Sequence, residues 1–156
     1  MVEGFIKYLT SDCPMVRTIR KLFRFRIIPM LNVDGVIIGN FRTNLSGDDL
    51  NRSFQKTNKV FHPVVWALKN MIEEDQAKGE SIMAFFDLHG HGARRNVFIY
   101  GPPVPANDDM AIRAKTYAYM LSKKTKMFKY GYCLWKLSKC KKSTARAYML
   151  HKLQSK

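Results

Sequence analysis

Residues 82–92 read Ile-Met-Ala-Phe-Phe-Asp-Leu-His-Gly-His-Gly, a short apolar run that ends in a polar, glycine-rich stretch. An apolar run of roughly four to eight residues between turn signals is typical of a buried strand. His89 would then lie at the end of a strand, where the sites of α/β proteins form. An imidazole in that place, close after Asp87, can bind a metal ion through one nitrogen. The alternative for a single histidine is a hydrogen-bonded side chain in a polar loop.

The segments on either side of this run alternate between helical and extended patterns. Apolar residues recur at helical spacing in residues 3–23 with a break at 11–14, in 64–72, and from 108 to about 123. Extended patterns occur in residues 23–30, 82–88, 96–100 and 130–137. Alternating strands and helices predict an α/β fold, with a mixed, mainly parallel sheet and helices on both faces. We expect residues 1–156 to belong to one domain, because no linker or internal repeat interrupts them.

A second polar segment, residues 32–54, is rich in Asn, Asp and Gly and shows no helical period. Irregular segments of this length within compact domains are often functional. This one carries three side chains that can donate hydrogen bonds to an anion, Arg42, Asn51 and Arg52. A guanidinium forks onto a carboxylate and an amide adds a further bond, so the group predicts a clamp for a terminal carboxylate. The alternative is a salt bridge within the loop, to Asp48 or Asp49.

The composition excludes several classes of protein. An apolar fraction of 46% is too high for a disordered chain. No apolar run approaches the roughly 20 residues that span a bilayer, and the N-terminus has no signal-peptide pattern. Three cysteines, Cys13, Cys133 and Cys140, form an odd set without paired spacing. These features predict a reduced compartment, the cytoplasm.

The net charge of +15 indicates either a solvated basic surface or an acidic partner. Much of the charge lies in two lysine clusters, within residues 123–129 and 136–142. An acidic polypeptide, an anionic membrane surface or a nucleic acid would each fit the charge alone. No groove-reading motif accompanies the lysines, so nucleic acid is not the expected partner.

Several stretches together resemble the cytosolic carboxypeptidases, a branch of the zinc metallocarboxypeptidases associated with removing glutamates from tubulin and other proteins. The matching stretches occur in the family's order and lie at residues 28–36, 39–42, 45–52, 87–91, 96–101 and 143–146. Acyl-amino-acid hydrolases with a related zinc core share a part of the third stretch. The Asp-Leu-His-Gly-His sequence at 87–91 favours the carboxypeptidase side.

The resemblance implies a role for each matching residue. His89 corresponds to a zinc ligand, and Asn51 and Arg52 to the clamp for the C-terminal carboxylate of the substrate. Arg42 corresponds to the catalytic group that polarises the scissile carbonyl. Asp49 corresponds to a residue that orients a zinc-binding histidine. Arg146 lies near the position that sets side-chain specificity, where a cation would suit an acidic residue.

The sequence also departs from the family pattern. No His-x-x-Glu motif occurs, although the resemblance implies two zinc ligands in such a motif. The ten residues after Arg146 contain no acidic residue that could act as the general base. One of the three protein ligands that catalytic zinc ordinarily needs is therefore present. We expect a partial zinc carboxypeptidase domain, truncated at both ends and inactive alone, whose family acts on glutamate-rich tails such as that of tubulin. The alternative is a degenerate module that binds acidic C-terminal tails without cleaving them.

Overall fold

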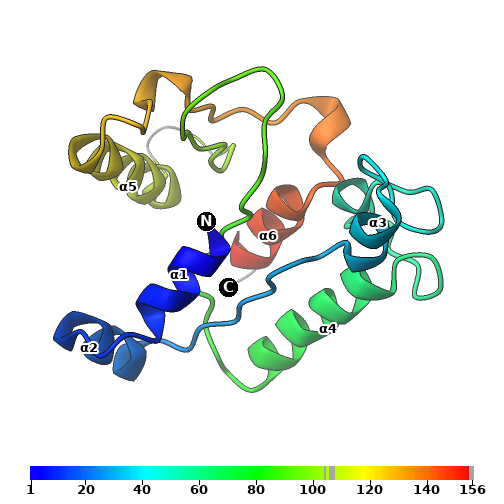
Figure 1. The fold of residues 1–156 in the computed structure, drawn as a ribbon, viewed down its shortest axis with the longest axis horizontal. Helices are drawn as coiled ribbons and strands as arrows, with labels where there is room; N and C mark the ends of the chain where they lie inside the picture. The colour runs from blue at the N-terminus through cyan, green and yellow to red at the C-terminus, as the bar shows by residue number, and fades with distance from the viewer. Residues whose placement is uncertain (104, 106–107, 155–156) are drawn as a thin grey trace.

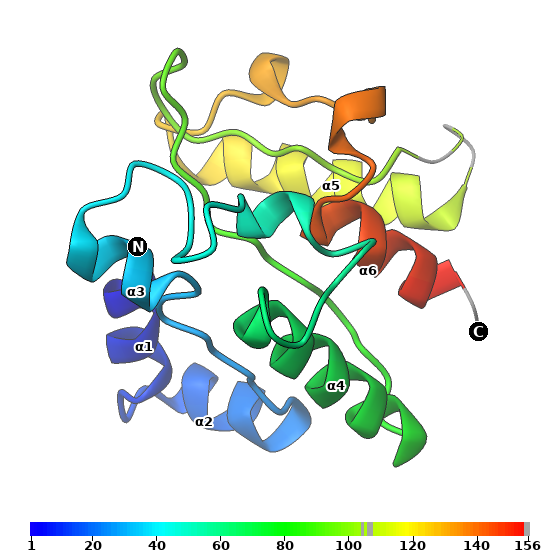
Figure 2. The ribbon, with the colours of Figure 1, turned by 90° about the vertical axis from the view of Figure 1, so that its right-hand side faces the viewer.

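The computed structural model describes residues 1–103, 105 and 108–154. Helices and short 3-10 turns are joined by long extended segments (Figures 1 and 2). The α-helices are α1 Val2–Leu9, α2 Pro14–Leu22, α3 Val33–Ile38, α4 Pro63–Ala77, α5 Asp109–Lys124 and α6 Ala145–Gln154. The 3-10 turns are η1 Leu50–Arg52, η2 Tyr130–Tyr132 and η3 Lys139–Lys141. In the described part of the chain, no helix combines the length and the apolar character that a membrane span requires.

The predicted helices are confirmed, and local sequence signals explain their ends. Proline occupies the first position of both α2 and α4, where its missing N–H costs nothing. Gly79 follows α4 with a φ of +80°, a conformation that glycine adopts without strain. The Asp108 side chain accepts a hydrogen bond from the Met110 N–H and caps the start of α5.

The predicted mainly parallel sheet is not formed by the residues that the structure describes. They contain only isolated bridges, Thr43 with Asp49, Val97 with Phe128, and Tyr100 with Leu134. The last two are parallel and join residues 97–101 to 127–134, where a neighbouring segment lies within reach. Residues 23–30 and 82–88 are extended, but no described segment pairs with their backbone groups. A strand exists only where a neighbour lies about 4.8 Å away, and the pattern of one segment cannot supply that neighbour.

Two further local predictions are wrong. The strand predicted at residues 130–137 begins instead with the 3-10 turn η2. The segment 32–54, predicted without helical structure, contains α3 and η1. The side chain of Asn32 caps α3 by accepting from the Gly35 N–H, and Gly39 ends it with a φ of +86°. Helices this short carry too few residues for a period to be recognised.

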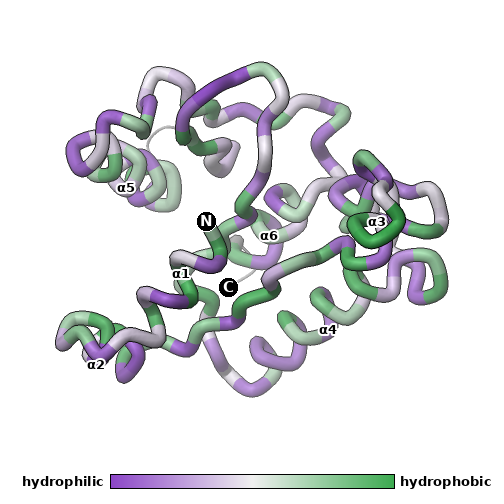
Figure 3. The backbone as a smooth tube through the Cα atoms, viewed as in Figure 1, coloured by the Kyte–Doolittle hydropathy of each residue, from purple (hydrophilic) through white to green (hydrophobic). Residues whose placement is uncertain are grey.

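The main core lies between α4, α6 and the residues around η1. Its buried members are Leu50, Phe54, Val65, Leu68, Ile72, Ala145 and Met149. A smaller cluster of Ala118, Phe128 and Cys133 fixes α5 to the segment that follows it. Apolar positions also run along the extended segment between α2 and α3 (Figure 3), where many of them are exposed.

An ion pair fastens the extended segment at 23–30 to α4. Arg26 donates to both carboxylate oxygens of Asp75, at 3.1 and 2.7 Å. The hydrogen bond from Arg26 lowers the pKa of the Asp75 carboxyl group, against the opposing effect of burial. The extended segment 23–30, which leads to the polar segment 32–54, is thereby held against α4.

Candidate functional site

The loop that precedes η1 is shaped by its own side chains. Asn44 is buried, and its side-chain oxygen accepts from the backbone N–H groups of Ser46 and Asp48 at 3.0 and 2.9 Å. The loop closes at the bridge between Thr43 and Asp49. Asp49 then caps η1, because its Oδ1 accepts from the Asn51 N–H at 2.9 Å. This places Asp49 and Asn51 at the same end of the turn.

Arg42 and Arg52 both lie close to one oxygen of the Asp49 carboxylate. Arg42 Nε is 3.1 Å from Asp49 Oδ2, and Arg52 Nη1 is 3.9 Å from the same oxygen. Arg52 Nη1 also donates to the backbone oxygen of Asn51 at 2.8 Å. The salt bridge within the loop, the alternative considered for the arginines, is therefore present. It brings the two guanidinium groups to one carboxylate.

The side chain of Asn51 connects three parts of the chain. Its Oδ1 accepts from the backbone N–H of Ala145, the first residue of α6, at 2.9 Å. Its Nδ2 donates to Asp87 Oδ2 at 3.4 Å. The N–H groups in the first turn of a helix have no partner within the helix. Asn51 provides the acceptor for one of them, that of Ala145. Asn51 thereby anchors η1 to both α6 and the end of the segment 82–88.

His89 lies at the far end of this chain of contacts, exposed to solvent. Its Nδ1 is 3.3 Å from Asp87 Oδ1. The hydrogen bond with Asp87 raises the pKa of the imidazole, and partial desolvation opposes this effect. The charge of Arg42 also lowers the pKa of His89 and that of Asp49 raises it. Through the contacts of Asp49, Asn51 and Asp87, His89 belongs to one neighbourhood with Arg42 and Arg52, although it is far from them in the sequence.

His91 has a different environment. Its Nδ1 accepts from the backbone N–H groups of Ala93 and Arg94, at 3.2 and 3.0 Å. In the neutral ring the proton must then be on Nε2, which donates to the Tyr100 hydroxyl at 3.1 Å. Both nitrogens are occupied, so His91 holds the shape of the loop after His89.

Arg146 is directed toward the backbone. Its guanidinium donates to the carbonyl oxygens of Gly101 and Lys136, at 3.1 and 3.3 Å, and lies 5.7 Å from the centre of the Tyr100 ring. Burial lowers the pKa of Arg146. The arginine follows Ala145 directly, but its hydrogen bonds join α6 to two neighbouring segments.

Asp87 is the residue of this neighbourhood that sequence reasoning did not assign. One of its oxygens faces His89 and the other accepts from Asn51, so it links the two polar segments. Its place directly after an apolar run, two residues before the histidine, was a usable signal. The contact with Asn51 spans 36 residues of sequence and carries no local signal.

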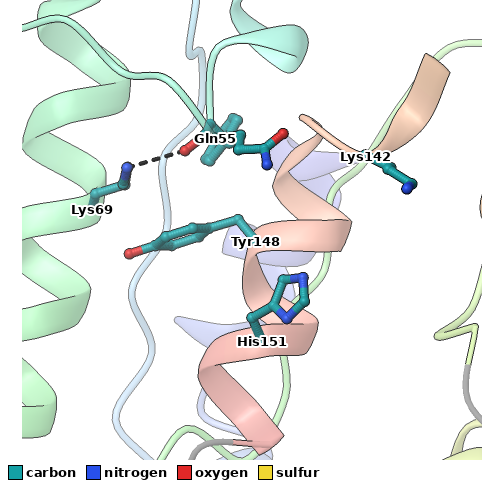
Figure 4. Close-up of a pocket in the computed structure, with 6 residues that line it drawn as sticks. Gln55, Lys69, Lys142, Tyr148 and His151 are labelled. Carbon is teal, nitrogen blue, oxygen red and sulfur yellow. Dashed lines mark hydrogen bonds between the residues drawn. The ribbon is translucent and has the colours of Figure 1, made fainter. Parts of the chain in front are cut away.

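A cavity of about 160 Å³ lies elsewhere, between α4 and α6 (Figure 4). It is lined by Phe54, Gln55, Lys69, Lys142, Tyr148 and His151. Lys69 spans one side, because its ammonium group donates to the Phe54 carbonyl at 3.0 Å (Figure 4) and to Thr57 Oγ1 at 3.1 Å. None of the candidate site residues is among the lining residues, so this cavity is separate from the neighbourhood of His89.

Metal-binding groups are sparse around His89. Among the residues that the structure describes, no group of three or more His, Cys, Asp or Glu side chains is arranged to hold a metal ion. The donors at hand are the imidazole of His89 and the carboxylate of Asp87 that binds it. Since a catalytic zinc ordinarily takes three protein ligands, the described residues do not by themselves fit the ion.

Comparison with known proteins relates the whole chain to one family. A family model described as zinc carboxypeptidase matches residues 1–151. Cytosolic carboxypeptidase 2 of Danio rerio is 36% identical over 150 residues, which cover 96% of this chain and 21% of that protein. Cytosolic carboxypeptidase 3 of Mus musculus is 36% identical over 153 residues, covering 96% of this chain and 15% of that protein. The chain thus spans about a fifth or less of the length of these curated relatives, and its resemblance to cytosolic carboxypeptidases is confirmed.

Solved structures agree with this relationship. A putative carboxypeptidase A from Shewanella denitrificans OS-217 superimposes with a TM-score of 0.81 at 26% identity, over 98% of this chain and 41% of that one. A metallo-carboxypeptidase from Burkholderia cenocepacia gives a TM-score of 0.75 at 28% identity, over 97% of this chain and 41% of that one. The arrangement of the described helices and extended segments is therefore that of part of the zinc carboxypeptidase fold.

Proposed function

Because the chain belongs to the zinc carboxypeptidase family, we propose that it supplies the carboxylate-binding part of a metallocarboxypeptidase that removes glutamates from proteins. The glutamates would be C-terminal or linked to side chains, in proteins such as tubulin. One observation carries the proposal: Asn51 donates to Asp87, which binds His89. Arg42 and Arg52 pair with Asp49, which accepts from the Asn51 N–H. Donors for a carboxylate and a candidate metal ligand thus lie together.

The proposed contribution of these residues is to bind and orient the substrate. Arg52 and Asn51 would bind the terminal carboxylate, since a planar guanidinium and an amide suit its two oxygens. Arg42 would lie against the carbonyl of the bond to be cleaved, where a cation stabilises developing negative charge. His89 would be one metal ligand. The described residues do not fit zinc by themselves, so we expect residues 1–156, as part of a catalytic domain, to be inactive alone.

Three features support an acidic substrate. The net charge of +15 favours acidic polypeptides at moderate ionic strength. Arg146, whose guanidinium donates to the Gly101 and Lys136 carbonyls, adds a cation on α6 that we propose favours an acidic side chain of the substrate. The relatives at hand carry the name cytosolic carboxypeptidase, and we propose that this protein likewise acts in the cytoplasm.

A second function is favoured by the absence of a three-ligand group among the described residues. The chain would then bind acidic C-terminal tails through Arg42, Asn51 and Arg52 without cleaving them. Binding and cleavage can be separated, because the donors for the carboxylate are present whether or not a metal is.

The test is incubation of the purified 156-residue chain with zinc and a peptide that ends in four glutamates, followed by mass spectrometry. We expect no loss of glutamate but measurable binding, weakened about tenfold by Arg52→Ala through the loss of charge-assisted hydrogen bonds. Arg113→Ala is the matched control, since Arg113 pairs with Asp109 on the exposed face of α5. Stepwise loss of glutamate that His89→Ala abolishes would contradict the expected inactivity. Equal binding by Arg52→Ala and the unaltered chain would contradict the clamp.

A further inference from the structure

The donors of the candidate clamp already lie close to carboxylates of the chain itself. Arg42 and Arg52 both face Asp49 Oδ2, at 3.1 and 3.9 Å, and Asn51 donates to Asp87 at 3.4 Å. A carboxylate from a ligand would need the same donors. Internal anions and a ligand would therefore compete for these donors.

Asp49 is held more firmly than the arginines that it binds. Its side chain is 21% exposed, against 30% for Arg52 and 54% for Arg42. Its two oxygens have different partners, because Oδ1 caps η1 through the Asn51 N–H and Oδ2 faces the guanidinium groups. The anion is thus fixed by the turn, and the longer cationic side chains can turn away from it toward solvent.

We propose that Asp49 is an internal competitor of the substrate carboxylate and thereby limits the affinity of the clamp for it. This inference rests on the proposed function of Arg42, Arg52 and Asn51. A ligand carboxylate competes with Asp49 Oδ2 for the two guanidinium groups. A terminal carboxylate can engage a guanidinium fork and the Asn51 amide together, so it meets this competition directly. Asp49 therefore lowers the affinity for a terminal carboxylate, whereas a ligand that does not engage the guanidinium groups is not affected.

The variant Asp49→Asn separates the two roles of Asp49, its negative charge near the arginines and its capping of η1. An asparagine keeps an oxygen that can accept from the Asn51 N–H, and asparagine is as good an N-cap residue as aspartate. The negative charge facing the arginines is removed, and an amide NH2 group takes the place of Oδ2. Asp34→Asn is the matched control, since it makes the same change of charge at an exposed position in the first turn of α3. Asp49→Ser, a second neutral capping residue, serves if the asparagine variant does not fold.

The measurement is fluorescence anisotropy of the 156-residue chain with two labelled peptides that end in four glutamates. One has a free C-terminal carboxylate and the other a C-terminal amide. We expect Asp49→Asn to bind the free-carboxylate peptide about three- to tenfold more tightly than the unaltered chain, as one charge-assisted hydrogen bond would allow. The affinity for the amide peptide, and both affinities of Asp34→Asn, should change less than twofold.

Two results overturn the inference while leaving the clamp intact. One is an unchanged or weaker affinity of Asp49→Asn for the free carboxylate, with Arg52→Ala still weakening binding about tenfold. The other is an equal gain for both peptides, which is a general effect of net charge. A different result overturns the proposed function, and the inference with it: no preference for the free carboxylate in either the unaltered chain or Asp49→Asn.

Discussion

At the scale of single residues, the site depends on carboxylates that each serve two partners. Asp87 binds His89 with one oxygen and Asn51 with the other. The hydrogen bond that His89 donates to Asp87 raises the pKa of His89, so the protonated ring is favoured in the folded chain. The stability that this contact contributes is present below the ordinary pKa of histidine, about 6.5, and is lost as the pH rises through the raised value.

The first prediction is that Asp87→Asn lowers the pKa of His89. The cause is the loss of the carboxylate that favours the imidazolium ion. Two-dimensional NMR of the imidazole resonances over a pH titration measures the midpoint directly. Asp12→Asn is the control, because Asp12 is an exposed partner of Arg17 near α2. The same His89 midpoint in the unaltered chain and in Asp87→Asn would show that the contact does not control the titration.

At the scale of elements, the position of η1 depends on the apolar core between α4 and α6. Phe54 follows η1, is 1% exposed and packs with the buried faces of α4 and α6. Its ring lies 6.1 Å from that of Tyr148 on α6. The positions of Asp49, Asn51 and Arg52 thus depend on an apolar side chain that does not belong to the site.

The second prediction is that Phe54→Ala lowers the free energy of unfolding by about 3–5 kcal/mol, through lost burial and the cavity that remains. Phe41→Ala should change it by no more than about 0.5 kcal/mol, since Phe41 is fully exposed at 102%. Urea unfolding followed by circular dichroism measures both values. A small cost for Phe54→Ala would mean that the cluster around η1 does not stabilise the fold.

At the scale of the whole molecule, the chain exposes far more surface than its mass requires. Its accessible area is 11449 Å² at 18.1 kDa, whereas a folded monomer of that mass exposes roughly 8,100 Å². Large apolar side chains of the two unpaired extended segments account for part of the excess, namely Phe23, Phe25, Ile27, Ile28, Met30, Met83, Phe86 and Leu88. Unpaired extended segments with apolar side chains favour association with other chains.

The third prediction is that the 156-residue chain binds a hydrophobic dye and associates as its concentration rises. Both effects follow from the exposed apolar side chains of residues 23–30 and 82–88. Fluorescence of the dye and light scattering after size-exclusion chromatography provide the measurements. The double variant Phe25→Lys with Phe86→Lys should reduce both signals. A chain that stays monomeric at all concentrations and does not increase the fluorescence of the dye would show that the exposed apolar side chains do not promote association.

The helices and the candidate site residues could be predicted because their signals are local. Apolar spacing, the prolines that begin α2 and α4, and the Asp108 cap act within one or two turns of the chain. The residues proposed for the site were found from residue type and from ordered matches to a family, and the structure brings Arg42, Asp49, Asn51, Arg52 and His89 together. Their roles stay predictions.

Pairing between distant segments was decided by the tertiary structure alone. The apolar segments 23–30 and 82–88 carry the pattern of strands, yet a ladder needs a neighbour that a one-dimensional pattern does not contain. The same reason explains Asp87, whose hydrogen bond with Asn51 joins residues that only folding brings together. By itself the sequence determined the family and the helices, and it predicted which side chains bind a carboxylate. The tertiary structure decided which internal anions hold those side chains, because charge pairing depends on distance in space and not on order in the chain.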